Sequence, residues 1–201
     1  MKRVKSVTKK DTILEEVLAL LHSHASEKFT MKNLADHLGR SKSSLYEYFP
    51  SKQVMITEAL EHLMAVNQSV VMTPLPSDDF RQNLKDYFLR VMRLVEEKRM
   101  MQNLVYHPEV NTLPKPLQTR LETKLKDVQA ANRAYFWAIM AQGIKRGDIT
   151  GPINDERKHV IESMMVGTMV EMSHQGLPFD KDSYLNELMD SIICVHQKPG
   201  D

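Results

Sequence analysis

The sequence contains few of the residues that cross-link chains or interrupt helices. It has one cysteine, Cys194, and only seven glycines among 201 residues. A single cysteine excludes an intrachain disulfide, which fits a reducing cytoplasm. No apolar run approaches the ~20 residues of a membrane-spanning helix, and Asp11, Glu15 and Glu16 interrupt any signal-peptide core. We therefore expect a cytoplasmic protein with no membrane partner.

Charge is nearly balanced overall but unevenly distributed along the chain. The formal net charge is +1, yet residues 1–53 contain ten Lys or Arg and six Asp or Glu. The remainder is slightly acidic. A basic N-terminal quarter on an acidic body predicts a polyanionic partner at that end only.

The composition and the spacing of apolar residues predict an all-α fold. The chain is rich in Leu, Met, Glu, Lys and Ala, which favour helix, and no segment alternates as a strand would. We expect about nine helices in total. Their approximate bounds are 11–25, 30–38, 41–49, 52–71, 80–98, 98–106 and 116–146, followed by two helices around 160–172 and 184–193. Residues 109–116, with Pro114 and Pro116, predict a loop.

The stretch from Thr30 to Lys52 has the parts of a helix-turn-helix motif. Thr30 and Ser41 can each cap a short helix, and Gly39 stands where a left-handed residue would end the first of them. The second helix places Leu45 and Phe49 on one face and basic or hydroxyl side chains on the other. Two short helices with an exposed hydrogen-bonding face predict a DNA-reading motif.

A helix before this motif completes a three-helix core. The apolar residues expected to meet there are Leu14, Val17, Leu21, Phe29, Leu34, Leu38, Leu45 and Phe49. We therefore divide the chain into a helix-turn-helix domain over residues 1–53, a connector helix over 52–71, and a helical ligand-binding and dimerisation domain over 72–201.

Residues 13–52 resemble the N-terminal DNA-binding domain of TetR-family transcriptional regulators. The resemblance rests on Phe29-Thr30 and on the segment LADHLGRSKSSLYEYFPSK that ends at Lys52. It implies a ligand-responsive regulator, not an enzyme, that binds a palindromic DNA operator as a homodimer. It further implies a repressor that a small-molecule inducer releases from DNA, without a cofactor.

The resemblance implies that the helix from about Ser41 to Phe49 enters the major groove. The candidate DNA-binding residues are Thr30, Lys32, Arg40, Ser41, Lys42, Ser43, Ser44, Tyr46, Tyr48 and Lys52. Lysine and serine can contact base edges, tyrosine hydroxyls suit phosphates, and Lys52 brings a charge to a helix N-terminus. Arg40, Ser43 and Glu47 depart from the residues usual in the family, so we expect operator preference to depend on them.

The body carries two further sets of candidates. For the dimer interface these are Val160, Met164, Thr168, Met172, Leu185, Met189 and Ile192, whose spacing would suit a four-helix bundle between two subunits. For an inducer pocket they are Met92, Met101, Tyr106, Trp137, Met140, Met165 and Met169, because methionines and aromatic rings adapt to apolar ligands. Either set can instead be ordinary core of a single subunit.

Two other functions remain open at this point. One is a helical small-molecule-binding protein of the same fold without operator-specific DNA binding, which an acidic Glu47 beside the reading face would suit. The other is a helical metalloenzyme, since Glu156 and His159, and Glu171 and His174, have the spacing of di-metal ligands. Both pairs lie on one expected helix, ~22 Å apart, where surface hydrogen bonds are the better interpretation. We expect no metal and no catalytic site.

Overall fold

A computed structural model describes residues 9–23, 30–75, 77–96, 107–149, 153–175 and 180–194. This described part of the chain contains nine helices and no strand, so the predicted all-α class is confirmed. The helices are α1 (Lys9–Ser23), α2 (Met31–His37), α3 (Lys42–Tyr46), α4 (Lys52–Val71), α5 (Phe80–Glu96), α7 (Pro108–Asn111), α8 (Lys115–Arg146), α9 (Asp155–Gln175) and α10 (Lys181–Cys194). The expected helix at 98–106 and the core residue Phe29 lie outside the described residues.

The chain divides into two compact units, each built from two segments. The first comprises residues 1–68 and 100–129, and the second comprises residues 69–99 and 130–201. Helices α4 and α8 are long enough to supply residues to both units. No helix in the described ranges is both long and apolar enough to span a bilayer.

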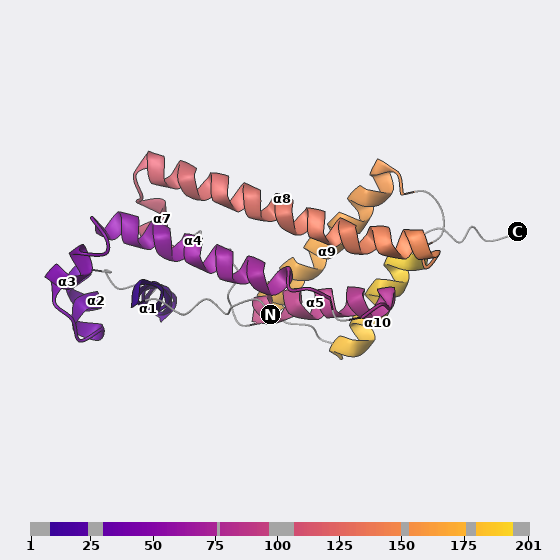
Figure 1. Ribbon diagram of the computed structural model, residues 1–201, viewed down its shortest axis with the longest axis horizontal. Coiled ribbons are helices and arrows are strands. Elements are labelled where there is room, and N and C mark those ends of the chain that lie inside the picture. Colours follow the sequence, from indigo (N-terminus) through magenta and orange to yellow (C-terminus); the bar gives the residue numbers. More distant parts are fainter. Residues whose placement is uncertain are drawn as a thin grey trace, which may run out of the picture. The chain divides into compact units, whose positions relative to one another are not determined.

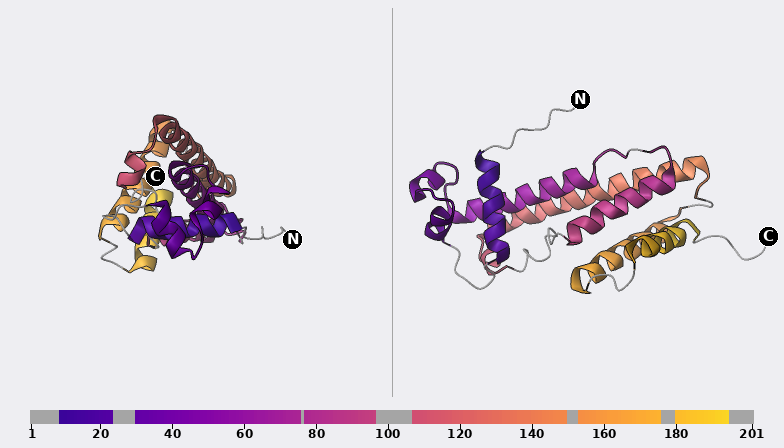
Figure 2. Two further views of the ribbon diagram at one scale, coloured as in Figure 1. Left: turned by 90° about the vertical axis from the view of Figure 1, so that its left-hand side faces the viewer. Right: turned by 90° about the horizontal axis from the view of Figure 1, so that it is seen from below.

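The first unit is held together by the apolar faces of α1, α2, α3 and α4. Its core includes Ile13, Leu14, Val17, Leu21, Leu34, Leu45, Phe49, Met55, Ile56 and Leu60, all buried. Six of the eight residues predicted for the three-helix core are among these, and Leu38 packs partly buried against them. Helix α1 crosses α4 (Figure 2), and α4 runs beside α8 (Figure 1), to which it is joined by a two-pronged ion pair of Glu61 with Arg120.

The turn between α2 and α3 is fixed by backbone hydrogen bonds. Gly39 adopts φ +59°, a left-handed conformation that glycine reaches without a Cβ clash. Its N–H donates to the carbonyl of Asp36 at 3.2 Å, and the Arg40 N–H donates to that of Ala35 at 2.8 Å. These two bonds make a Schellman motif, which satisfies carbonyls left unpaired at the end of α2. The predicted role of Gly39 is thus confirmed.

One expectation about a loop is wrong. Residues 109–116 do not form a continuous loop, because α7 occupies Pro108–Asn111 and α8 already begins at Lys115. Pro108 stands at the first position of α7 and Pro116 in the first turn of α8. Proline is tolerated there because the first N–H groups of a helix have no intrahelical partner. The prolines therefore mark helix starts as well as the break between them.

The second unit packs α5 against α9 and α10 (Figure 1). From α5 it buries Phe80, Leu84, Tyr87 and Phe88; from the C-terminal half of α8 it buries Phe136, Ile139 and Met140. Gly143 of α8 allows a close approach, since a Cβ there would lie 2.7 Å from the Phe80 ring. The core of this unit is therefore aromatic on the α5–α8 side.

Candidate nucleic-acid interface and ligand pocket

Helix α3, which was predicted to enter the major groove of DNA, is capped as its sequence predicts. The Ser41 Oγ accepts a hydrogen bond from the Ser44 N–H at 3.1 Å, and the Ser44 Oγ donates back to the Ser41 carbonyl at 2.8 Å. At the start of α2, the Thr30 Oγ1 accepts from the Asn33 N–H at 3.1 Å. Both predicted N-caps are confirmed. Any contact of these hydroxyls with DNA would come in addition to capping.

Half of the ten candidate DNA contacts are exposed on the first unit, and the other half are half-buried. Lys32, Lys42, Ser43 and Tyr46 are exposed, and the Tyr46 side chain is 48% exposed although α3 buries Leu45 completely. Thus α3 buries Leu45, leaves Ser44 half-buried, and exposes Lys42, Ser43 and Tyr46. Its exposed face carries one lysine, several hydroxyls and no acidic residue before Glu47.

Of the five half-buried candidates, Thr30 and Ser44 belong to the capped helix starts, and the other three have surroundings of their own. Arg40 is half-buried, and Tyr48 is half-buried against the core, with its ring 6.3 Å from that of Phe49. Lys52, the first residue of α4, has its Nζ 2.6 Å from the Glu109 Oε2 in α7. No DNA is present, so the roles of all ten candidate contacts stay predictions.

The carboxylate beside Lys52 belongs to a firmly held turn. His107 caps α7, because its Nδ1 accepts from the Glu109 N–H at 3.1 Å, while its Nε2 is buried without a partner among the described residues. Burial lowers the pKa of His107 below its usual value; Glu109 opposes this shift and His22 adds to it. A neutral imidazole is the form that can accept the capping hydrogen bond.

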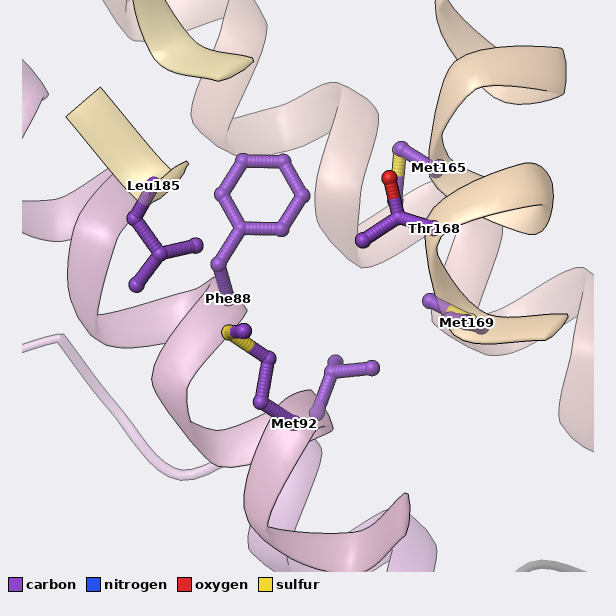
Figure 3. A pocket seen from close by; sticks show the side chains of 7 residues that line it. Phe88, Met92, Met165, Thr168, Met169 and Leu185 are labelled. Carbon is purple, nitrogen blue, oxygen red and sulfur yellow. The ribbon is translucent and has the colours of Figure 1, made fainter. Parts of the chain in front are cut away.

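A small apolar cavity lies inside the second unit. Figure 3 shows Phe88 and Met92 of α5 facing Met165, Thr168 and Met169 of α9. Val91 and Leu185 complete the lining, and the cavity volume is about 10 Å³. This is roughly the room that one water needs, and the walls are almost wholly apolar. Three predicted pocket methionines, Met92, Met165 and Met169, thus line one cavity.

The other predicted pocket residues do not line that cavity. Met140 is fully buried in the second unit, and Trp137 is half-buried, donating its Nε1–H to the Glu162 carboxylate at 2.8 Å. Met101 and Tyr106 lie outside the described residues. Tyr87 packs near this region with its ring 5.4 Å from Phe136, and burial, with a smaller contribution from Tyr135, raises its pKa to about 12.

A larger open groove runs between the α4–α5 connection and α8. Its volume is about 530 Å³, and its walls include Met72, Leu75, Ala138, Gln142 and Arg146. No sequence pattern indicated this groove, because it depends on how a loop lies over a helix. The groove is mixed in polarity, with the Arg146 guanidinium 3.6 Å from the Asp78 carboxylate.

The residues predicted for the dimer interface are divided between the surface and the core. Val160 is 47% exposed and Met164 is half-buried, whereas Thr168, Leu185, Met189 and Ile192 are buried in their own unit. Thr168 also shares a hydrogen bond with the Tyr184 hydroxyl at 2.9 Å. The side chain of Met172 lies outside what the structure describes.

Sequence reasoning missed two exposed valines on α9. Val166 is 59% exposed and Val170 is 39% exposed, on a turn beside Gly167, where a Cβ would meet nothing within 4 Å. Their spacing of four residues is a helical signal that was available in the sequence.

Among the side chains described, no group of three His, Cys, Asp or Glu residues could hold a metal ion.

Comparisons with known proteins agree with this architecture. The sequence profile of a family described as "Bacterial regulatory proteins, tetR family" matches residues 13–59. No curated protein gave a match over the sequence.

Solved structures share the fold over nearly the whole chain. The TetR-family regulator PfmR from Thermus thermophilus is 18% identical, with a TM-score of 0.63 over 96% of this chain and 99% of that one. A TetR-family protein described as a putative transcriptional regulator from Vibrio parahaemolyticus is 18% identical, with a TM-score of 0.58 over 92% and 97%. A protein described as superantigen PfiT is 14% identical, with a TM-score of 0.65 over 99% and 100%. At these identities the likeness establishes the fold, and the matched profile identifies the N-terminal domain. Residues 13–59 are therefore a TetR-family helix-turn-helix domain, and the chain as a whole has the fold of solved TetR-family regulators.

Proposed function

We propose that this regulator is a repressor that binds a palindromic operator as a homodimer and leaves it when a small-molecule inducer binds. The observation that carries the DNA-binding part is the exposed face of α3. Leu45 anchors this helix in the core, and Lys42, Ser43 and Tyr46 lie outside. A short helix that presents lysine and hydroxyl groups can contact both base edges and phosphates.

A second candidate is a binding protein of this fold that does not read an operator. Glu47 favours it, because this residue is exposed at the end of α3 and would repel phosphate. The fold alone does not decide between the two functions, since it is also that of a protein described as a superantigen.

Gel retardation with the DNA that flanks the protein's own gene separates these candidates. A repressor should retard one fragment specifically, and the logarithm of its affinity should fall linearly with the logarithm of the salt concentration. Equal, weak binding to all fragments even at low salt would contradict the repressor and favour the second candidate.

Tyr46→Ala should weaken operator binding about tenfold, the order of one lost phosphate or base contact. Stability should change by less than about 0.5 kcal/mol, because the side chain is half-exposed on the surface. Fluorescence anisotropy with labelled operator measures the first effect and thermal unfolding the second. Tyr46→Phe is the matched control that removes only the hydroxyl. Unchanged affinity in Tyr46→Ala would exclude Tyr46 as a DNA contact.

We place the dimer contact on the outer face of α9. Among the α9 side chains that the structure describes, Val160, Val166 and Val170 are the exposed large apolar ones, and the open space beside Gly167 would let a second helix approach closely. The outer face of α10 is polar, with Asn186, Glu187 and Ser191 exposed, so it can form only the rim of such a contact. A two-fold axis at this face would place two helix-turn-helix domains in one dimer, and binding to two half-sites requires them to lie about one helical turn of DNA apart, ~34 Å.

We place the inducer in the methionine-lined cavity of the second unit. At about 10 Å³ it must widen to admit a ligand, and the three methionines that line it can change rotamer at low cost. Its apolar walls predict an apolar inducer, with Thr168 as a hydroxyl partner. The open groove beside α8 is the competing location.

A dye-binding experiment distinguishes the two locations. Met169→Trp should fill the cavity and reduce the fluorescence of bound 1-anilinonaphthalene-8-sulfonate at least about fivefold. Ala138→Trp, which obstructs the groove from an exposed position on α8, should leave that signal unchanged. The opposite result would assign the dye to the groove. Circular dichroism checks that both variants keep their helices.

A further inference from the structure

The ion pair between Lys52 and Glu109 bears directly on how tightly the first unit can bind DNA. Lys52 opens α4, just after Ser51, whose Oγ caps the helix by accepting from the Val54 N–H at 3.2 Å. Its Nζ lies 2.6 Å from the Glu109 Oε2, and the two side chains are only 25% and 15% exposed. A charge-assisted hydrogen bond of this length is a strong one, and limited exposure shields it from salt.

Glu109 is held in place from both sides along the chain. Before it, His107 caps α7 and Pro108 fixes the first helical position. After it, Val110 and Leu113 are buried in the core shared with α1 to α4. The carboxylate is therefore presented to the start of α4 by a fixed turn, although 57 residues separate it from Lys52 in sequence.

A phosphate and the Glu109 carboxylate would compete for the same ammonium group. While Lys52 is paired with Glu109, its charge is neutralised at close range, and a DNA phosphate nearby would meet a carboxylate as well as a lysine. The other lysines of this surface, Lys32 and Lys42, are exposed. The ion pair with Glu109 thus keeps Lys52, one of the cations of the helix-turn-helix domain, from contacting DNA phosphate.

We propose that Glu109 is a positioning residue that holds Lys52 away from the DNA backbone and thereby limits operator affinity. The inference rests on the proposed function, since it requires that the head binds DNA. It adds that α7, which contains none of the candidate DNA contacts, sets the strength of binding through one carboxylate.

Glu109→Gln tests this directly, because it keeps the size and the backbone cap while removing the charge. With two heads per dimer, the plot of log affinity against log salt should become steeper by about 2, since each newly contacted phosphate adds about 0.9. Affinity at moderate salt should rise about tenfold. A purely structural role would alter unfolding but not the salt slope.

Two further variants identify the group through which Glu109 acts. Lys52→Gln should abolish the gain, so that the double variant Glu109→Gln with Lys52→Gln binds as Lys52→Gln alone does. Glu61→Gln is the matched control: it removes a carboxylate bonded at 2.6–2.7 Å to Arg120, farther along the same helix α4. This control should leave the salt slope as in the wild type.

The outcomes separate the two proposals. If the wild type binds its operator but Glu109→Gln leaves the slope unchanged or makes it shallower, the role of Glu109 is overturned and the repressor stands. If Lys52→Gln fails to cancel the gain, the role of Lys52 is overturned. If the wild type binds no DNA at all, both the repressor and this inference fail together.

Discussion

Val166→Glu is expected to convert the proposed homodimer into a monomer and to weaken operator binding at least about 100-fold. Val166 is the most exposed of the large apolar side chains in the described residues, at 59%. On an isolated subunit a charge there costs little, because the position faces water. In the dimer that we propose, the same charge would be buried without a partner, which costs about 3–5 kcal/mol. One head alone covers a half-site, so specific affinity would fall with the dimer.

Sedimentation velocity and operator binding measure the two consequences. Ser191→Glu is the control, because it adds the same charge to the polar outer face of α10. It should remain dimeric and keep wild-type affinity. A Val166→Glu protein that still sediments as a dimer would show that the subunits meet elsewhere.

Phe49→Ala is expected to cost about 3–5 kcal/mol of unfolding free energy, the usual range for truncating a buried phenylalanine. The side chain is fully buried in the core of the first unit, three residues after the end of α3. The Lys10 Nζ also lies 5.1 Å from its ring centroid, a cation–π contact that the truncation removes. Because the whole stability of a domain is about 5–15 kcal/mol, this variant should lose operator binding at temperatures where the wild type keeps it.

Urea unfolding followed by circular dichroism gives the free energy, and Phe49→Leu calibrates it. Leucine refills most of the space, so its cost should stay under about 1.5 kcal/mol. A loss below about 1 kcal/mol for Phe49→Ala would mean that the core of the head does not depend on this ring.

Local interactions explain why the structure of the helix-turn-helix domain could be predicted best from the sequence. Thr30 and Ser41 each cap the helix that follows by accepting a hydrogen bond from an N–H three residues along the chain. The turn at Gly39 ends α2 through hydrogen bonds that span at most five residues. The rows Leu34 with Leu38 and Leu45 with Phe49 follow helical spacing. Such features depend on neighbouring residues alone, so the sequence pattern contains them.

Contacts between distant segments were not predictable in the same way. Lys52 was predicted only as a DNA contact, and no residue near it in sequence indicates its ion pair with Glu109. On α9 the spacing identified an apolar row that includes Thr168, but the structure turns Thr168 toward Tyr184 and leaves Val166 and Val170 outside. Which row a helix buries depends on the helices that it packs against, and helical periodicity does not identify them. For α9 these are α5 and, through the Thr168–Tyr184 hydrogen bond, α10.

The Schellman turn at Gly39 has a consequence for how this protein can change over evolutionary time. The turn is closed by backbone groups of Ala35, Asp36, Gly39 and Arg40, with no contribution from a side chain of the reading face. The backbone turn that orients α3 is thus independent of the side chains that we propose to contact DNA. If these side chains contact DNA as proposed, mutations at Arg40, Lys42, Ser43 or Tyr46 can change the preferred DNA sequence, and with it the regulated genes, while the fold stays the same.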